Sequence, residues 1–148
     1  MKLRSPMTEV AFHVNVPDLL GYACRLIRKG YLLGMSMLVV GDARQVALLN
    51  KQLWSMRSVD FVPHCLGSEE HATVVRSAVV LTDDEAQGQA RGFDVLVNLS
   101  GNMPSAYASF DKIFEVVSVA DADLEAARQR WRAYLQAGLA PKRHEIQP

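Results

Sequence analysis

Apolar residues along the chain form two kinds of pattern, short runs and longer stripes that recur every three or four residues; the run at 10–16 alternates loosely and the one at 35–40 is nearly continuous. A short continuous run is typical of a strand buried on both faces of a sheet, and a recurring stripe predicts an amphipathic helix. Five runs lie at residues 10–16, 35–40, 78–81, 93–99 and 113–119, and three stripes lie at about 19–29, 43–54 and 121–136. Strands that alternate with helices in this order predict an α/β domain with a mainly parallel sheet.

Proline, glycine and capping residues mark the ends of these elements. Pro17 ends the first run, because proline cannot donate to a sheet ladder, and Asp18 can cap the helix that follows. Gly138 is placed to stop the last helix. The 148 residues contain no internal repeat or linker, so we expect a single domain over 1–141 and a flexible C-terminal tail over 142–148.

Charge and cysteine content narrow the function classes. Sixteen Lys and Arg residues balance sixteen Asp and Glu residues, whereas proteins that hold nucleic acid through its phosphates usually carry a basic excess. Direct DNA binding is therefore disfavoured. Cys24 and Cys65 form no CxxC pair, and no apolar stretch approaches the roughly 20 residues that span a bilayer. We expect a cytoplasmic protein with reduced cysteines and no membrane association.

Chemical motifs are weak throughout the chain. Neither GxGxxG nor GxxxxGK[ST] occurs, no histidine or cysteine pair has zinc-ligand spacing, and no nucleophile elbow is present. The Ser-Gly-Asn turn at 100–102, before a short helix begun by Pro104, could present backbone N–H groups to an anion, but a plain strand-to-helix turn explains it as well. We therefore expect no catalytic residue, no cofactor and no metal. The alternative is a small nucleotide-binding α/β enzyme with its anion site at 100–102.

The last helix carries a basic ridge beside an apolar stripe. At about 100° per residue the stripe collects Leu124, Ala127, Trp131, Tyr134 and Leu135. Arg128 and Arg132 lie along one edge of the stripe, while Arg130 lies on the other flank. This arrangement suits a partner that carries a carboxylate beside a bulky apolar group. The alternative is an ordinary solvated face, because acidic residues at the start of a helix and arginines near its end complement the helix dipole.

An aromatic pair flanks an irregular segment after the second helix. Trp54 ends that helix, and Phe61 opens an extended piece that includes Pro63 and His64. Tryptophan is enriched at the centres of interfaces, but aromatic residues also dominate cores. A core role and a partner-binding role both fit the pair. A generic interaction domain that binds a helical partner at Trp54 and Phe61 is a further alternative.

A series of short motifs follows one order along the chain. They are LW at 53–54, FVPH at 61–64, FDVLVNL at 93–99, EVV at 115–117, ARQRWRAY at 127–134 and AG at 137–138. Taken in this order, they resemble the motifs of the chi subunit family of the bacterial DNA polymerase III holoenzyme. The resemblance covers nearly the whole chain.

The resemblance implies a Rossmann-like three-layer fold without a nucleotide site, in a non-catalytic accessory subunit of the clamp-loader complex. Chi pairs with the small psi subunit, and its other face binds the acidic, phenylalanine-ending C-terminal tail of single-stranded-DNA-binding protein, so that it meets DNA only indirectly. The positions that this resemblance assigns to the tail are Arg128, Arg132, Trp131, Leu124 and Leu135. The positions that it assigns to psi are Trp54, Phe61, Pro63 and His64.

One of these positions departs from the family pattern. Relatives often carry a lysine one turn before Arg128, where this chain has Leu124. The ridge therefore has one positive charge fewer. Either a lower affinity for the tail or a contribution from Lys142 and Arg143 is expected.

Overall fold

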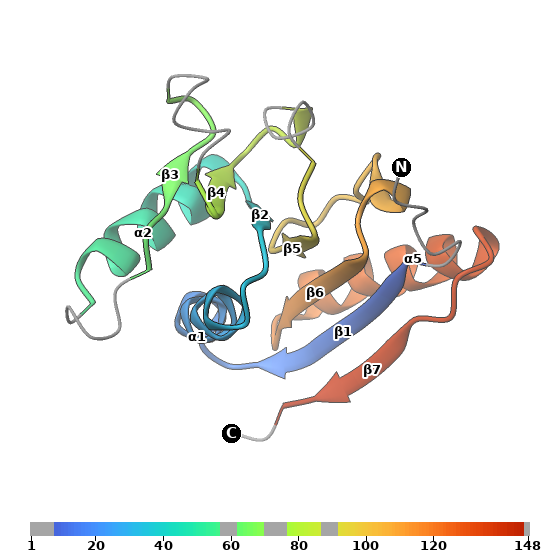
Figure 1. The fold of residues 1–148 in the computed structure, drawn as a ribbon. Helices are drawn as coiled ribbons and strands as arrows, with labels where there is room; N and C mark the ends of the chain where they lie inside the picture. Colours follow the sequence, from blue (N-terminus) through green and yellow to red (C-terminus); the bar gives the residue numbers. More distant parts are fainter. Residues whose placement is uncertain (1–7, 57–61, 70–76, 87–91, 147–148) are drawn as a thin grey trace, which may run out of the picture.

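Seven strands of the described chain pair into one sheet in which all neighbours run parallel (Figure 1). The structure is a computed structural model that describes residues 8–56, 62–69, 77–86 and 92–146. The strands are β1 (Glu9–Val16), β2 (Met37–Val40), β3 (Cys65–Leu66), β4 (Val79–Thr82), β5 (Val95–Asn98), β6 (Lys112–Ser118) and β7 (Lys142–Glu145). Their order across the sheet is β3-β4-β2-β5-β6-β1-β7.

Helices of the described chain cover both faces of this sheet. They are α1 (Leu19–Leu32), α2 (Ala43–Trp54) and α5 (Asp121–Gln136), with a single 3-10 turn at Tyr107–Ser109. Buried residues of α1 and α2 join one hydrophobic cluster, and those of α5 join another on the opposite face. The expected α/β class with a Rossmann-like three-layer arrangement is confirmed. No helix within the described ranges combines the length and the apolar character that a bilayer crossing requires.

Strand β1 contributes to both clusters because its pleat breaks near its end. Phe12 and Val14 are buried in the cluster under α5. Asn15 takes a positive φ of 62°, and the pairing of β1 with β6 shifts register between His13 and Val16. Val16 consequently packs with α1 instead of continuing the alternation toward α5. The face of β1 that packs against α5 is therefore formed by the residues before the register shift, including Phe12 and Val14.

Side-chain caps start both α1 and α2, and the cap at Asp18 is the one that the sequence predicts. Asp18 accepts a hydrogen bond from the backbone N–H of Gly21 at 3.1 Å. At α2 the caps are reciprocal, since Gln45 N–H donates to Asp42 at 2.8 Å and Asp42 N–H donates to the Gln45 side chain at 2.9 Å. These bonds satisfy N–H groups that the first turn of a helix leaves without partners. The second cap fixes the start of α2 beside the carboxyl end of β2.

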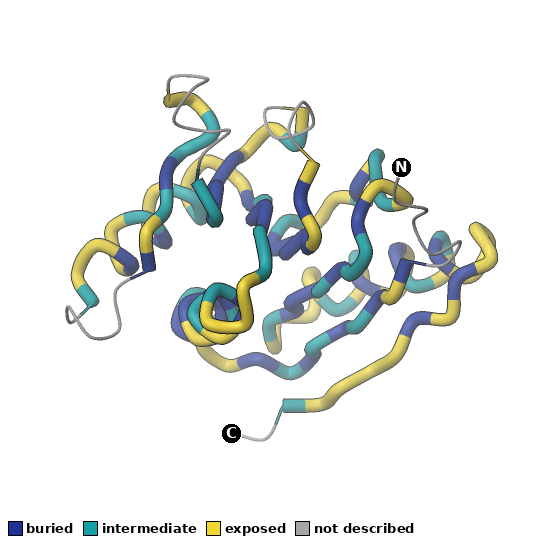
Figure 2. Tube along the Cα trace, in the orientation of Figure 1, coloured by how far each residue is buried: buried dark blue, intermediate teal, exposed yellow. Residues whose placement is uncertain are grey.

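The C-terminal segment differs from the flexible tail that the sequence predicts. Gly138, with a φ of 86°, ends α5 as expected. Residues Lys142–Glu145 then form β7, which pairs in parallel with β1 although all four side chains are exposed (Figure 2). The prediction of a tail from residue 142 is therefore wrong for 142–145. These four polar residues show no apolar pattern that would predict a strand. They are ordered because their backbone groups pair with an edge of β1 that would otherwise lack a neighbour.

The short helix expected after Pro104 is reduced to the 3-10 turn at Tyr107–Ser109. The backbone N–H groups of Ser105 and Ala106 donate to the Glu85 carboxylate at 3.0 and 2.8 Å. Glu85 belongs to the loop after β4, so this contact ties two loops together. The N–H groups at the start of a helix have no partners within the helix, and here the Glu85 carboxylate accepts from the two N–H groups in that position.

Candidate functional site

A pocket of about 410 Å³ opens between α5 and the strands β1 and β7. Its lining residues come from these three elements and are Phe12, Val14, Leu124, Ala127, Arg128, Trp131, Arg132 and Arg143. The elements belong to opposite ends of the chain and meet at one edge of the sheet (Figure 1). The pocket therefore forms only when the chain folds.

The floor of this pocket is apolar. Phe12 and Val14 project from β1 and are 2% and 8% exposed. Trp131 of α5 packs against Phe12, with ring centroids 5.2 Å apart and ring planes inclined at 58°. Ala127 also lines the pocket, and its small side chain leaves space above the floor. A concave apolar surface held by a strand and a helix is a preformed site for a bulky apolar group.

Arginine side chains border this floor. Arg128 and Arg132 stand one helical turn apart on α5, and Arg143 stands on β7. The Arg128 side chain is 65% exposed and lies 3.3 Å from Glu125, and the Arg143 side chain is 63% exposed and lies 3.8 Å from Glu145. Ion pairs this exposed stabilise a fold very little, so an anionic ligand can replace either glutamate. Of the described residues that line the pocket, none is acidic. The site fits a carboxylate beside a bulky apolar group.

The structure brings together four of the five residues predicted for the tail. They are Leu124, Arg128, Trp131 and Arg132. The fifth, Leu135, is 51% exposed and lies outside the lining of the pocket. The sequence did not connect Phe12 and Val14 with this site. Their alternation marks one face of a strand, but the pattern does not tell which helix covers that face.

Arg130, which the sequence placed on the other flank of the helix, is buried in an ion pair with Glu115. The Arg130 Nε–H donates to Glu115 at 3.0 Å, and the two side chains are 5% and 0% exposed. Tyr134 and Asn98 donate to the same carboxylate at 2.7 and 3.0 Å. Burial raises the pKa of Glu115, while Arg130 and the donated hydrogen bonds act in the opposite direction. Burial and the adjacent carboxylate raise the pKa of Tyr134.

A signal for this ion pair was present in the sequence. Ile113, Glu115 and Val117 alternate along β6, so a carboxylate occupies the middle of an inward-facing apolar row. A buried carboxylate requires a cation or several donors. Arg130 and Tyr134 are four residues apart on α5 and therefore share the helix face that covers this row.

The aromatic surface after α2 lies on a different part of the molecule. Trp54 is 60% exposed, and its ring centroid lies 5.1 Å from that of His64. The Nε2 atom of His64 lies 3.0 Å from the Asn50 side chain, which holds the ring in place. Pro63 beside it is exposed, and Phe61 lies outside the described residues. Trp54 is thus a surface residue supported by a fixed ring, and a core role does not describe it.

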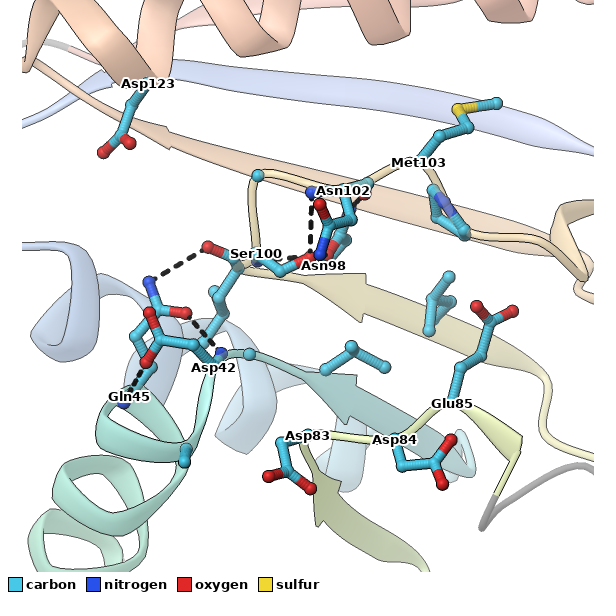
Figure 3. Close-up of a pocket in the computed structure, with 17 residues that line it drawn as sticks. Asp42, Gln45, Asp83, Asp84, Glu85, Asn98, Ser100, Asn102, Met103 and Asp123 are labelled. Carbon is cyan, nitrogen blue, oxygen red and sulfur yellow. Dashed lines mark hydrogen bonds between the residues drawn. The ribbon is translucent and has the colours of Figure 1, made fainter.

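A second pocket of about 580 Å³ lies at the carboxyl ends of β2, β4 and β5 (Figure 3). Sheets of this type commonly bind ligands in that crevice. Here its lining includes five acidic residues, which are Asp42, Asp83, Asp84, Glu85 and Asp123. Among the described lining residues there is neither lysine nor arginine. A phosphate group would meet charges of its own sign.

Several polar groups that could bind an anion in this crevice are hydrogen-bonded within the protein. The carboxylate of Asp42 accepts from the first turn of α2. The N–H and hydroxyl groups of Ser100 donate to Asn98 at 3.1 and 2.7 Å, and Asn102 N–H donates to Ser100 at 3.2 Å (Figure 3). This geometry favours a plain turn at 100–102 and disfavours a nucleotide-binding enzyme.

Comparison with known proteins agrees with the motifs in the sequence. A family model described as DNA polymerase III chi subunit, HolC, matches residues 7–142. The chain is also similar to the DNA polymerase III subunit chi of Pseudomonas aeruginosa, with 33% identity over 95% of this chain and 98% of that protein. The family model spans the α5 wall and the β1 floor of the pocket and residues 54–64 of the aromatic surface, and it ends one residue before Arg143. The chain belongs to the DNA polymerase III chi subunit family.

Proposed function

We propose that this chain is a non-catalytic accessory subunit of the replicative DNA polymerase III clamp-loader complex, and that it acts in the cytoplasm. In this role it links that complex, through the psi subunit, to the acidic C-terminal tail of single-stranded-DNA-binding protein during DNA replication. Membership of the chi subunit family supports the association with the polymerase. A formal net charge of zero favours contact with DNA through protein partners over direct binding.

The observation that carries the tail-binding proposal is an apolar floor bordered by arginines. A C-terminal phenylalanine presents an aromatic ring and a carboxylate on the same residue. The ring packs on Phe12 and Trp131, and the carboxylate accepts hydrogen bonds from Arg128 and Arg132. Leu124 supplies one apolar wall of the pocket. Leu135 contributes at most to the outer edge of this site.

The psi-binding proposal rests on the aromatic surface. A tryptophan that is 60% exposed leaves a large apolar area in water, and partners commonly cover such residues. Trp54, Pro63 and His64 supply the described part of this surface, and we assign Phe61 to it from the sequence. Because Trp54 ends α2 and the pocket lies against α5, the two partners bind on opposite faces of the sheet and do not compete.

Titration with a fluorescent peptide of the host's single-strand-binding-protein tail tests the first part. We expect binding that requires the terminal phenylalanine and weakens with salt, because exposed charge pairs are screened. Arg128→Ala should weaken binding about 30-fold, which corresponds to about 2 kcal/mol. Arg44→Ala is the matched control, since Arg44 is exposed on α2, across the sheet from the pocket. Absence of binding at low salt, or equal losses in the two variants, would exclude this pocket as the tail site.

Co-purification with psi tests the second part and separates the two surfaces. Trp54→Ala should lose psi and keep the tail peptide, whereas Arg128→Ala should keep psi and lose the peptide. Retention of psi by Trp54→Ala would show that the aromatic surface is wrongly assigned. A pull-down from the host that recovers neither clamp-loader nor single-strand-binding components would favour a generic interaction domain.

A further inference from the structure

Strand β7 distributes its positive charges between the two faces of the sheet. Its register with β1 places Arg143 beside Phe12 and Lys142 beside Ala11. Because side chains alternate along a strand, Arg143 enters the pocket under α5, whereas Lys142 lines a separate hollow on the opposite face. Of these two adjacent cations, only Arg143 reaches the proposed tail site.

Arg143 extends the arginine border to a second wall of the pocket. Arg128 and Arg132 belong to the α5 wall, and the apolar floor of Phe12 and Trp131 lies between them and β7. A ligand that spans the pocket therefore meets cations at both ends and apolar surface in the middle. A peptide with acidic residues before a terminal aromatic residue has this distribution of charge.

The position of β7 also suits a peptide that continues beyond the pocket. β7 is the last strand on its side of the sheet, so no described strand pairs with its outer edge. Its side chains are exposed along its whole length (Figure 2). An extended peptide can use the backbone groups of such an edge. The contact of Arg143 with Glu145, at 3.8 Å between exposed groups, is weak enough for an incoming carboxylate to replace it.

We propose that Arg143 binds an acidic residue upstream of the terminal phenylalanine of the tail and directs the tail across β7. This inference rests on the proposed function, because it takes the tail as the ligand of the pocket. Arg128 and Arg132 hold the terminal residue, and Arg143 recognises the acidic residues that precede it. Strand β7 then helps the protein to distinguish tails with acidic residues before the terminal phenylalanine from tails without them.

The test is a double-mutant cycle, measured by fluorescence anisotropy at about 0.15 M salt, where charges more than about 8 Å apart are largely screened. Tail peptides in which each upstream acidic residue is replaced in turn by its amide are titrated against wild type and Arg143→Ala. Arg143→Ala should weaken binding of the native peptide about threefold to fivefold. One amide peptide should bind both proteins equally, and dependence on the terminal phenylalanine should persist.

Lys142→Ala is the matched control, because it removes the same charge from the adjacent residue on the opposite face. It should change affinity by less than about twofold. Arg143→Glu combined with a peptide that carries lysine at the coupled position should recover the affinity that each change loses alone. Melting temperatures equal to that of wild type show that the variants are folded.

The outcomes separate this inference from the proposal on which it rests. Equal effects of Arg143→Ala and Lys142→Ala, or equal effects of Arg143→Ala on every peptide, would overturn the assignment of Arg143 and leave the tail site intact. Failure of the wild-type protein to bind any phenylalanine-ending peptide would overturn the proposed function itself.

Discussion

Two pockets among the described residues carry opposite charges. The crevice at the carboxyl ends of the strands, about 580 Å³, is lined by five acidic side chains. The pocket between α5 and β7, about 410 Å³, is bordered by Arg128, Arg132 and Arg143. The crevice at the carboxyl ends of the strands, where Rossmann-like sheets commonly bind phosphate groups, is acidic in this protein and therefore disfavours phosphate. The arginines of the other pocket gather instead at the edge of the sheet, where the last helix and the last strand meet.

A buried network connects the two regions. Asn98 lines the acidic crevice and donates to Glu115, which holds Arg130 of α5. The same helix therefore carries one arginine that anchors it to the sheet and others that line the pocket. Arg128 and Arg130 are two residues apart, yet their side chains are 65% and 5% exposed. Arg130 therefore points into the core and pairs with Glu115, whereas Arg128 points toward solvent at the border of the pocket.

The largest expected effect separates these two arginines. Arg130→Met should lower the free energy of unfolding by about 3 kcal/mol, because it leaves the buried carboxylate of Glu115 without its cation. Arg128→Met should lower it by less than about 0.5 kcal/mol, since its ion pair is exposed. Urea denaturation measures both. The folded fraction of Arg130→Met should still bind the tail peptide, and equal destabilisation by the two substitutions would contradict the division of roles.

A smaller effect is expected from pH, through His13 on the face of β1 opposite the pocket. Burial, followed by the charges of His144 and Lys29, lowers the pKa of His13 to about 4. The unfolded chain binds this proton more tightly, with a pKa near 6.5, so the neutral ring contributes stability above about pH 6.5 that is lost as pH falls toward 4. The stability difference between wild type and His13→Gln should shrink by about 1 kcal/mol over this range, after allowance for solvent screening.

The affinity for the tail peptide, measured over the same pH series, should differ from the stability in its dependence on pH. Arginine stays charged at all these pH values, so tail affinity should change by less than about twofold between pH 6 and 8. Chemical denaturation and peptide titration across this series give the two curves. A stability difference that does not vary with pH would show that His13 titrates normally.

The smallest expected effect is that of nucleotides on thermal stability. ATP and NAD at millimolar concentration should shift the melting temperature by less than about 1 °C, because the acidic crevice repels their phosphates. The tail peptide, at about 100 times its dissociation constant, should stabilise the fold by about 2.7 kcal/mol and raise the melting temperature by several degrees. A shift of several degrees with either nucleotide would show that the acidic crevice binds phosphate groups, and would favour the enzyme alternative.

Elements with a strong apolar pattern could be predicted from the sequence. The stripe from 121 to 136 became α5 (Asp121–Gln136), and Asp18 caps the helix that it precedes. Strand β7 could not be predicted, because its order comes from pairing with a strand more than a hundred residues earlier. Backbone pairing of this kind leaves no periodic signal in four polar residues.

The candidate site was only partly predictable for a similar reason. The ridge of Arg128 and Arg132 follows from helical spacing, and both arginines do line the pocket. The contribution of Phe12 to the floor required the order of the strands in the sheet. The sequence offered Lys142 and Arg143 together, and only the register of β7 decides that Arg143 lines the pocket. The roles of these residues in partner binding stay predictions.

Local periodicity, a capping residue and ordered motifs were enough to predict the class of the fold, its long helices and the family to which the chain belongs. They could not predict which arginine is buried, which strand lies beneath the last helix and where positive charge gathers. Those features depend on contacts between residues far apart in the chain. Such contacts exist only after the sheet has brought the first and last strands together.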